Sequence, residues 1–198
     1  MKRILIKLLN KIDLFKNRIF CIVKFKRFKV FGKLPEVRGN IKLFGHGECF
    51  FGENVVINSS LRSNPIGGAE KTIISISEGA KLEIGENTGI SNTTIVCRKH
   101  IRVGKNVRIG GNTCIYDTDF HSLDLKKRIS ANDDDIKCRE IVIADGAFIG
   151  AHCIILKGVT IGENSIVGAG SVVTKDIPDN EIWGGNPVKF IRKNEDSI

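Results

Sequence analysis

The sequence has little proline and few aromatic residues other than phenylalanine, and it lacks several common motifs. It contains 4 prolines, 1 tryptophan and 1 tyrosine, against 21 glycines and 11 phenylalanines. Chains rich in glycine and aliphatic residues favour strands and tight turns. No long uncharged apolar run is present, so we expect no membrane-spanning segment. Lysines recur too often in the first thirty residues for the apolar core of a signal peptide.

The cysteines also lack a functional pattern. All six stand singly, at positions 21, 49, 97, 114, 138 and 153. None has CxxC spacing, so neither a zinc site nor a redox motif is indicated. We expect reduced, buried thiols in a cytoplasmic protein. A GxxxxGK[ST] nucleotide loop is missing as well.

The positive charge is confined to one end of the chain. Residues 1–33 hold eleven Lys or Arg and one acid, which gives +10, whereas the whole chain has a net charge of +9. The other 165 residues therefore sum to −1. A basic arm favours an anionic partner such as a membrane surface. No nucleic-acid-binding motif accompanies it, so we expect no nucleic acid partner.

In the second half of the chain, aliphatic residues recur every six positions. The blocks run "IVIADG AFIGAH CIILKG VTIGEN SIVGAG SVVTKD". The third letter of each block is aliphatic: Ile143, Ile149, Ile155, Ile161, Val167 and Val173. An earlier run contains Ile84, Ile90, Val96, Val103, Ile109 and Ile115, and a weaker turn contains Phe51 and Ile57. A period of six is not helical, and it fits short strands separated by turns. Glycines that follow many of these residues supply unusual backbone angles. Three blocks close one triangular coil, and stacked coils form a solenoid of three parallel sheets.

The repeat breaks between Ile115 and Ile143, where the segment "YDTDFHSLDL" begins. An irregular stretch of this length is unusual inside a compact domain and points to function, so we expect residues 116–140 to protrude as a loop. His121 lies near its start, and a histidine can accept and return a proton near neutral pH. Asp119 is the first candidate to orient the imidazole, and Asp117 is the second.

The repeat, together with "IGENSIVGAGSVVTKDIP" and "GGNPVKFIRK", resembles the left-handed β-helix acyltransferases over roughly residues 40–193. "GISNTTIV", "YDTDFHSLD" and "GAFIGAHCIILKGVTIG" are most similar to acetyltransferases of bacterial surface-polysaccharide synthesis. The resemblance implies an all-β, left-handed parallel β-helix in a homotrimer, with active sites between chains. It also implies O-acetylation of a saccharide acceptor by acetyl-CoA, with His121 as general base and no acetyl-enzyme.

Further site residues follow from the resemblance. The N–H of Ala151 would face the thioester oxygen, Gly150 and Ala169 would line the pantetheine arm, and Thr174 and Lys175 would lie toward the nucleotide. Lys189 and Arg192 would meet the phosphates of CoA. Tyr116, Asp124 and Phe148 would contact the acceptor; relatives often have tryptophan at the position of Phe148.

Two alternatives stay open, and a third is disfavoured. The same base would serve N-acetylation of an amino-sugar nucleotide or a small amine, and a β-helix can also be a non-catalytic scaffold. Gamma-class carbonic anhydrases share the solenoid and use three histidines, two of them five positions apart. The histidines here, at 46, 100, 121 and 152, contain no such pair, so we expect no metal.

The sequence divides into three parts. Residues 1–33 form the basic arm, whose apolar residues recur at helical spacing. It would lie on an anionic membrane through residues 1–31, at the inner face of the cell membrane, or its apolar stripe would pack on the trimer or cap the first coil. Residues 34–183 form the β-helix, and residues 184–198 a capping segment with a short basic C-terminal helix. Pro187 ends regular structure before it.

Overall fold

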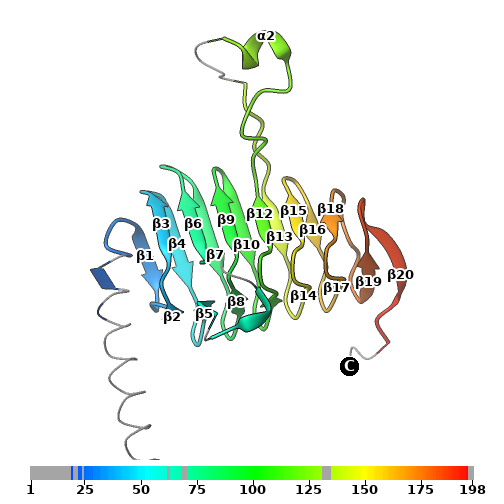
Figure 1. The fold of residues 1–198 in the computed structure, drawn as a ribbon, viewed down its shortest axis with the longest axis horizontal. Coiled ribbons are helices and arrows are strands. Elements are labelled where there is room, and N and C mark those ends of the chain that lie inside the picture. The colour runs from blue at the N-terminus through cyan, green and yellow to red at the C-terminus, as the bar shows by residue number, and fades with distance from the viewer. Residues whose placement is uncertain are drawn as a thin grey trace, which may run out of the picture.

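The structure, a computed structural model, describes residues 19, 22, 23, 25–61, 63–67, 71–130 and 135–195. Its strands form three sheets, which are the sides of a triangular prism of stacked coils, a left-handed parallel β-helix (Figure 1). No helix in these residues is long and apolar enough to cross a membrane.

Each turn of the prism contributes one strand to each sheet. Sheet A contains β1 (Lys29–Gly32), β4 (Glu48–Phe51), β7 (Lys81–Ile84), β10 (His100–Val103), β13 (Ile141–Ile143) and β16 (Thr160–Ile161). Sheet B contains β2 (Glu36–Gly39), β5 (Val56–Ser59), β8 (Gly89–Ser91), β11 (Arg108–Ile109), β14 (Phe148–Ile149), β17 (Ile166–Val167), β19 (Glu181–Gly184) and β20 (Lys189–Lys193). Sheet C contains β3 (Lys42–Gly45), β6 (Ile73–Ile76), β9 (Thr94–Cys97), β12 (Cys114–Tyr116), β15 (Ile154–Leu156) and β18 (Val172–Val173).

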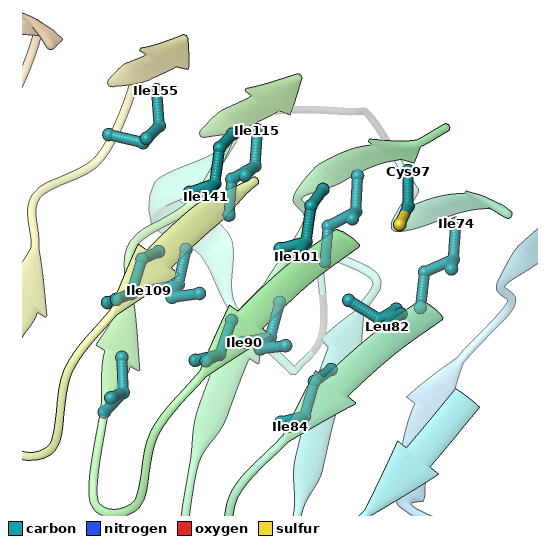
Figure 2. Packing of buried hydrophobic residues seen from close by; sticks show 14 of the residues in the cluster. Ile74, Leu82, Ile84, Ile90, Cys97, Ile101, Ile109, Ile115, Ile141 and Ile155 are labelled. Carbon is teal, nitrogen blue, oxygen red and sulfur yellow. The ribbon is translucent and has the colours of Figure 1, made fainter. Parts of the chain in front are cut away.

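The core consists of aliphatic columns along the prism axis (Figure 2). The six third-letter residues predicted from the second half are all fully buried, as are Phe51 and Ile57. Val96 is the exception: it is half-exposed, whereas its neighbours Ile95 and Cys97 are buried. Alternation along a strand allows only one of the two sets to point inward, and Ile95 pairs with Ile115 in register. The prediction that Val96 is buried is therefore wrong, because the spacing of the earlier run is irregular.

The glycines that follow the aliphatic residues are needed for close approach of neighbouring coils. A Cβ on Gly85 would lie 2.5 Å from the carbonyl carbon of Gly104, and one on Gly150 would lie 2.5 Å from the nitrogen of Ala169. Their backbone angles are ordinary, contrary to the sequence-based expectation. Left-handed backbone angles occur at other positions of the described chain, held by eight other glycines and by the asparagines at 54, 87, 92, 106, 112, 164 and 180. Asparagine tolerates this conformation better than most residues.

The solenoid begins earlier than residue 34. β1 lies in the stretch assigned to the arm, yet it pairs with β4 along all four of its residues. Phe25 is 2% exposed, and its ring packs edge-on against Phe51 at 5.5 Å between centroids. These residues close the first coil. The predicted arm helix lies largely outside the described residues.

The predicted C-terminal helix is wrong, because residues 189–193 form strand β20. β20 runs antiparallel to β19, with Gly184 paired to Lys189 and Glu181 to Lys193. The Lys193 Nζ and the Trp183 Nε1 both donate to the carboxylate of Glu181, at 2.6 and 2.7 Å. These donors hold the pKa of Glu181 below its ordinary value. The turn "GGNP" reverses the chain, so the end of sheet B is extended by a hairpin instead of being covered by a helix.

Two segments interrupt the coils. The first follows β5 and contains the short 3-10 helix η1 (Pro65–Gly67). The second is the predicted loop, which leaves the prism between β12 and β13 and carries the one-turn helix α2 (Leu125–Arg128) (Figure 1). Since β12 belongs to sheet C and β13 to sheet A, the loop projects from the corner between these two sheets.

Candidate active site

The base of the protruding loop is a two-stranded neck. Thr118 and Cys138 form an antiparallel bridge. The Arg139 N–H donates to the Asp117 carbonyl at 2.9 Å, and the Asp119 N–H donates to the Lys137 carbonyl at 3.1 Å. The irregular segment therefore starts from a defined base, and the residues just beyond the neck are held in place by it.

Asp117 is fully buried and serves the backbone. Its Oδ1 accepts from the Arg98 N–H at 2.7 Å, and its Oδ2 accepts from the N–H groups of Lys99 and His100 at 2.7 and 2.9 Å. These donors form the turn that precedes β10, where the chain leaves sheet C one coil earlier. Asp117 therefore ties the foot of the loop to the preceding coil, a function that its place in the sequence did not indicate.

Asp119 lies at the edge of the neck and pairs with a lysine of the next coil. Its Oδ1 is 2.7 Å from the Lys157 Nζ, and the two side chains are 17% and 22% exposed. Its Oδ2 is buried and has no hydrogen-bond partner among the described residues. Oδ1 is thus fixed by an ion pair, whereas Oδ2 can still accept a hydrogen bond.

Phe120, immediately before His121, has a left-handed backbone conformation. Its φ is +66°, and its N–H donates to the Thr118 Oγ1 at 3.2 Å. Its ring packs edge-on against Tyr116, with 5.1 Å between centroids. Burial, with a further contribution from the Cys114 thiol, raises the pKa of Tyr116, so its hydroxyl stays protonated. His121 itself is exposed at the surface of the loop.

The segment beyond His121 is fixed by α2. The carboxylate of Asp124 caps this helix, accepting from the N–H groups of Lys126 and Lys127 at 2.8 and 3.3 Å. The Arg128 guanidinium donates to the Ser122 carbonyl at 2.9 Å. Asp124, predicted to contact the acceptor, therefore has a local structural task as a helix N-cap.

The small residues predicted to line the pantetheine arm lie at another corner, between sheets B and C. Gly150 and Ala151 follow β14, and Ala169 occupies the equivalent turn one coil later. Within the described residues, the N–H groups of Ala151 and Ala169 donate no hydrogen bond. Ala151 is half-exposed and Ala169 exposed, so both N–H groups remain available to a ligand. His152, with φ +61°, is an exposed residue of the same turn.

The basic residues predicted for the nucleotide end lie at the C-terminal end of the prism. Thr174 and Lys175 are exposed just after β18, and the Lys175 Nζ sits 5.0 Å from the centre of the Trp183 ring. Lys189 and Arg192 are exposed on β20. Phe148 is 47% exposed on the outer face of β14.

A single chain does not unite these groups at one corner. His121, Asp119 and Tyr116 belong to the corner between sheets C and A, whereas Ala151 and Ala169 belong to the corner between sheets B and C. Sequence analysis named residues of both groups but had no means to see this separation, because the corner that each occupies follows from the assignment of strands to sheets.

Three buried thiols are poorly suited to catalysis. Burial raises the pKa of Cys49 to about 12 and raises the pKa of Cys97 and Cys153 as well. Thiols in this state are poor nucleophiles at neutral pH. The described part of the chain contains no cluster of three or more His, Cys, Asp or Glu residues able to hold a metal ion.

Comparison with known proteins agrees with the repeat and the fold. Residues 140–175 match the family model of the bacterial transferase hexapeptide (six repeats). The six-residue repeat of this segment is thus similar to the hexapeptide repeat of bacterial transferases, and it lies in the coils of a left-handed β-helix.

Individual relatives extend the match. The galactoside O-acetyltransferase of Lactococcus lactis is 44% identical over 108 residues, which are 54% of this chain and 49% of that protein. A hexapeptide-repeat-containing acetyltransferase from Vibrio cholerae, solved with acetyl coenzyme A, is 25% identical with a TM-score of 0.58, covering 88% of this chain and 76% of that one. A mutant N-acyltransferase from Bacillus cereus, solved with dTDP and coenzyme A, has a TM-score of 0.69 at 24% identity over 88% and 89% of the two chains, a likeness of fold alone. The chain spans about half the length of the curated relatives it matches.

Proposed function

We propose that this protein is an acetyl-CoA-dependent O-acetyltransferase that acts on a hydroxyl group of a saccharide belonging to a surface polysaccharide or its precursor. The observation that carries the proposal is the loop after β12, whose hydrogen-bonded neck is followed by an exposed histidine two positions after an aspartate with one unpartnered oxygen. The sugar-acting relative at 44% identity favours a hydroxyl acceptor. The N-acyltransferase is similar in fold only.

In the proposed reaction, His121 removes the proton from the acceptor hydroxyl. Asp119 orients the imidazole and stabilises its protonated form through its unpartnered Oδ2. The sugar oxygen then bonds to the thioester carbon, and the Ala151 N–H stabilises the resulting oxyanion. Collapse breaks the carbon–sulfur bond, and His121 returns its proton to the departing CoA thiolate.

The separation of the two groups requires a second copy of the chain. His121 of one chain would meet Ala151 and Ala169 of a neighbour, where the donor would lie. A closed trimer gives each chain the same two neighbours and makes three equivalent sites. The loop, which projects from the prism, is the element that would reach across (Figure 1).

The test is His121→Ala, with His46→Ala as the matched control because His46 is an exposed turn residue near the opposite end of the prism. Acetyl transfer to a saccharide should fall by about 10²–10⁴ in the first variant, the usual contribution of a general base. The control should keep the wild-type rate. Release of CoA is measured with acceptor in excess, and binding of CoA is measured separately. Near-normal turnover by His121→Ala would refute the mechanism.

A further inference from the structure

The outer face of sheet B carries a groove of about 540 Å³. It runs across β2, β5, β8 and β11 and ends at Phe148 on β14. None of the residues assigned to the donor or to the general base lines it, and of the residues assigned to the acceptor only Phe148 does. The rest of the groove has no role in the reaction described above.

One row of the sheet under the groove lacks a side chain. Val56, Gly89, Arg108 and Phe148 are register partners in four successive coils. The Arg108 side chain lies over Gly89: a Cβ built there would be 3.3 Å from the Arg108 Cδ and 3.7 Å from its Nε. The φ of Gly89 is not positive, so backbone geometry does not demand this glycine. Its missing side chain instead makes room for the Arg108 side chain on the bottom of the groove.

The polar groups in the groove suit an anionic ligand. Its lining contains two guanidinium groups, Arg38 and Arg108, and no carboxylate. The Arg38 Nε pairs with Glu36 at 2.8 Å, and the Arg108 Nη1 donates to the Asn87 carbonyl at 2.5 Å, so both groups are held in place. Guanidinium groups bind carboxylate and phosphate through paired hydrogen bonds.

An unsatisfied amide adds an independent observation. The Oδ1 of Asn58 lies in the groove lining, is shielded from solvent and has no partner among the described residues. Its Nδ2 reaches the Ser91 Oγ only at 3.4 Å. Buried polar atoms normally have partners, and a ligand hydroxyl would supply one here. Amides, a hydroxyl and an exposed aromatic ring beside two cations are groups that bind sugars bearing acidic substituents.

The groove leads directly to the proposed oxyanion site. Gly110 lines its end, and a Cβ on Gly110 would lie 2.5 Å from the Ala151 nitrogen. A saccharide lying in the groove would therefore have one end at the corner where acetyl transfer is proposed.

We propose that this groove binds an anionic unit of the acceptor saccharide, with Arg108 and Arg38 holding its carboxylate or phosphate and Asn58 holding a hydroxyl. The inference rests on the proposed function for the identity of the acceptor, but the binding itself does not require catalysis. Specificity for acidic glycans would then reside on sheet B, away from the His121 of the same chain.

Binding to the full-length protein without acetyl-CoA provides the test. Calorimetric titration would use trigalacturonic acid, the neutral trisaccharide galactotriose, and galactose 1-phosphate as a separate phosphate probe. We expect trigalacturonic acid or the phosphate to bind more tightly than the neutral sugar, and the tighter of the two anions identifies the group recognised. Arg108→Gln should weaken that binding roughly 10- to 100-fold, the range for a lost charged hydrogen bond. Gly89→Leu should abolish it, because the leucine side chain would displace the Arg108 side chain that lies over Gly89.

Arg102→Gln is the matched control, because Arg102 is the exposed arginine on sheet A in the same coil; it should bind like the wild type. Equal binding of neutral and anionic sugars, or no loss in Arg108→Gln, would overturn the proposal. Dissociation of the oligomer by Gly89→Leu, seen in its mass by light scattering, would also overturn it, since the face would then be an interface between copies. Failure of the acetyl-transfer proposal appears elsewhere, as intact groove binding with no release of CoA from acetyl-CoA.

Discussion

Two aspartates two positions apart have different tasks in this loop. Both were candidates to orient His121, because spacing alone does not distinguish them. The carboxylate of Asp117 is occupied by three backbone N–H groups of residues 98–100, whereas Asp119 keeps one oxygen without a partner. The donors come from the preceding coil, some eighteen positions away, and no local pattern could have revealed them. We therefore retain Asp119 as the orienting residue.

Asp117→Asn should destabilise the protein. The amide nitrogen of asparagine would face backbone N–H donors, leaving at least one buried group without a partner, at a cost of about 1–3 kcal/mol. Asp124→Asn is the control, because asparagine caps a helix as well as aspartate does. Urea unfolding of both variants measures the difference. An Asp117→Asn protein that is no less stable than Asp124→Asn would show that this backbone anchoring is dispensable.

At the scale of elements, the six-residue period predicted the strands and buried faces of the second half of the chain, because the period itself is the geometry of one side of the prism; in the earlier run it assigned Val96 wrongly. The period did not predict features that depend on contacts between neighbouring coils. The pairing of β1 with β4, the hairpin of β19 and β20, and the groove over Gly89 all depend on cross-strand register. A glycine in a strand looks the same in the sequence whether it permits close packing of two coils or makes room for a neighbouring side chain.

The start of the solenoid gives a test of the N-terminal arm. Deleting residues 1–18 removes six of its eleven basic residues but leaves Phe25, Phe28 and β1 in place. If the arm binds anionic membrane, this deletion should keep the melting temperature and lose most binding to anionic vesicles, since each basic residue near such a surface contributes about 1 kcal/mol.

Deleting residues 1–32 is the contrasting variant. It removes β1 and uncovers Phe51, so it should lower the melting temperature strongly. Calorimetry and vesicle sedimentation at low and high salt measure both effects, and the electrostatic part should weaken as salt rises. A large loss of stability in the shorter deletion would show that the arm packs on the trimer instead.

At the scale of the whole molecule, the two parts of the proposed site lie at different corners of the prism, so assembly of several chains would have to bring them together. The proposed base lies at the corner between sheets C and A. The exposed turn N–H groups lie at the corner between sheets B and C, so each half of the proposed site is on a different edge of the prism. Assembly then joins unlike halves, and no chain would work alone.

This arrangement predicts rescue between two inactive variants. His121→Ala lacks the base, and Ala151→Phe fills the donor corner with a side chain that blocks CoA. Each homotrimer should be inactive. In trimers co-expressed with two different tags and purified through both in turn, a working site needs the base of an Ala151→Phe chain beside the corner of a His121→Ala chain. Random mixing gives this combination at about one site in four before tag selection, and at about one site in three once only doubly tagged trimers remain. Activity near a third of wild type after tag selection, together with a light-scattering mass of three chains, is the expected result. If base and donor corner served the same chain, every mixture would stay inactive, because no chain in it carries both intact groups.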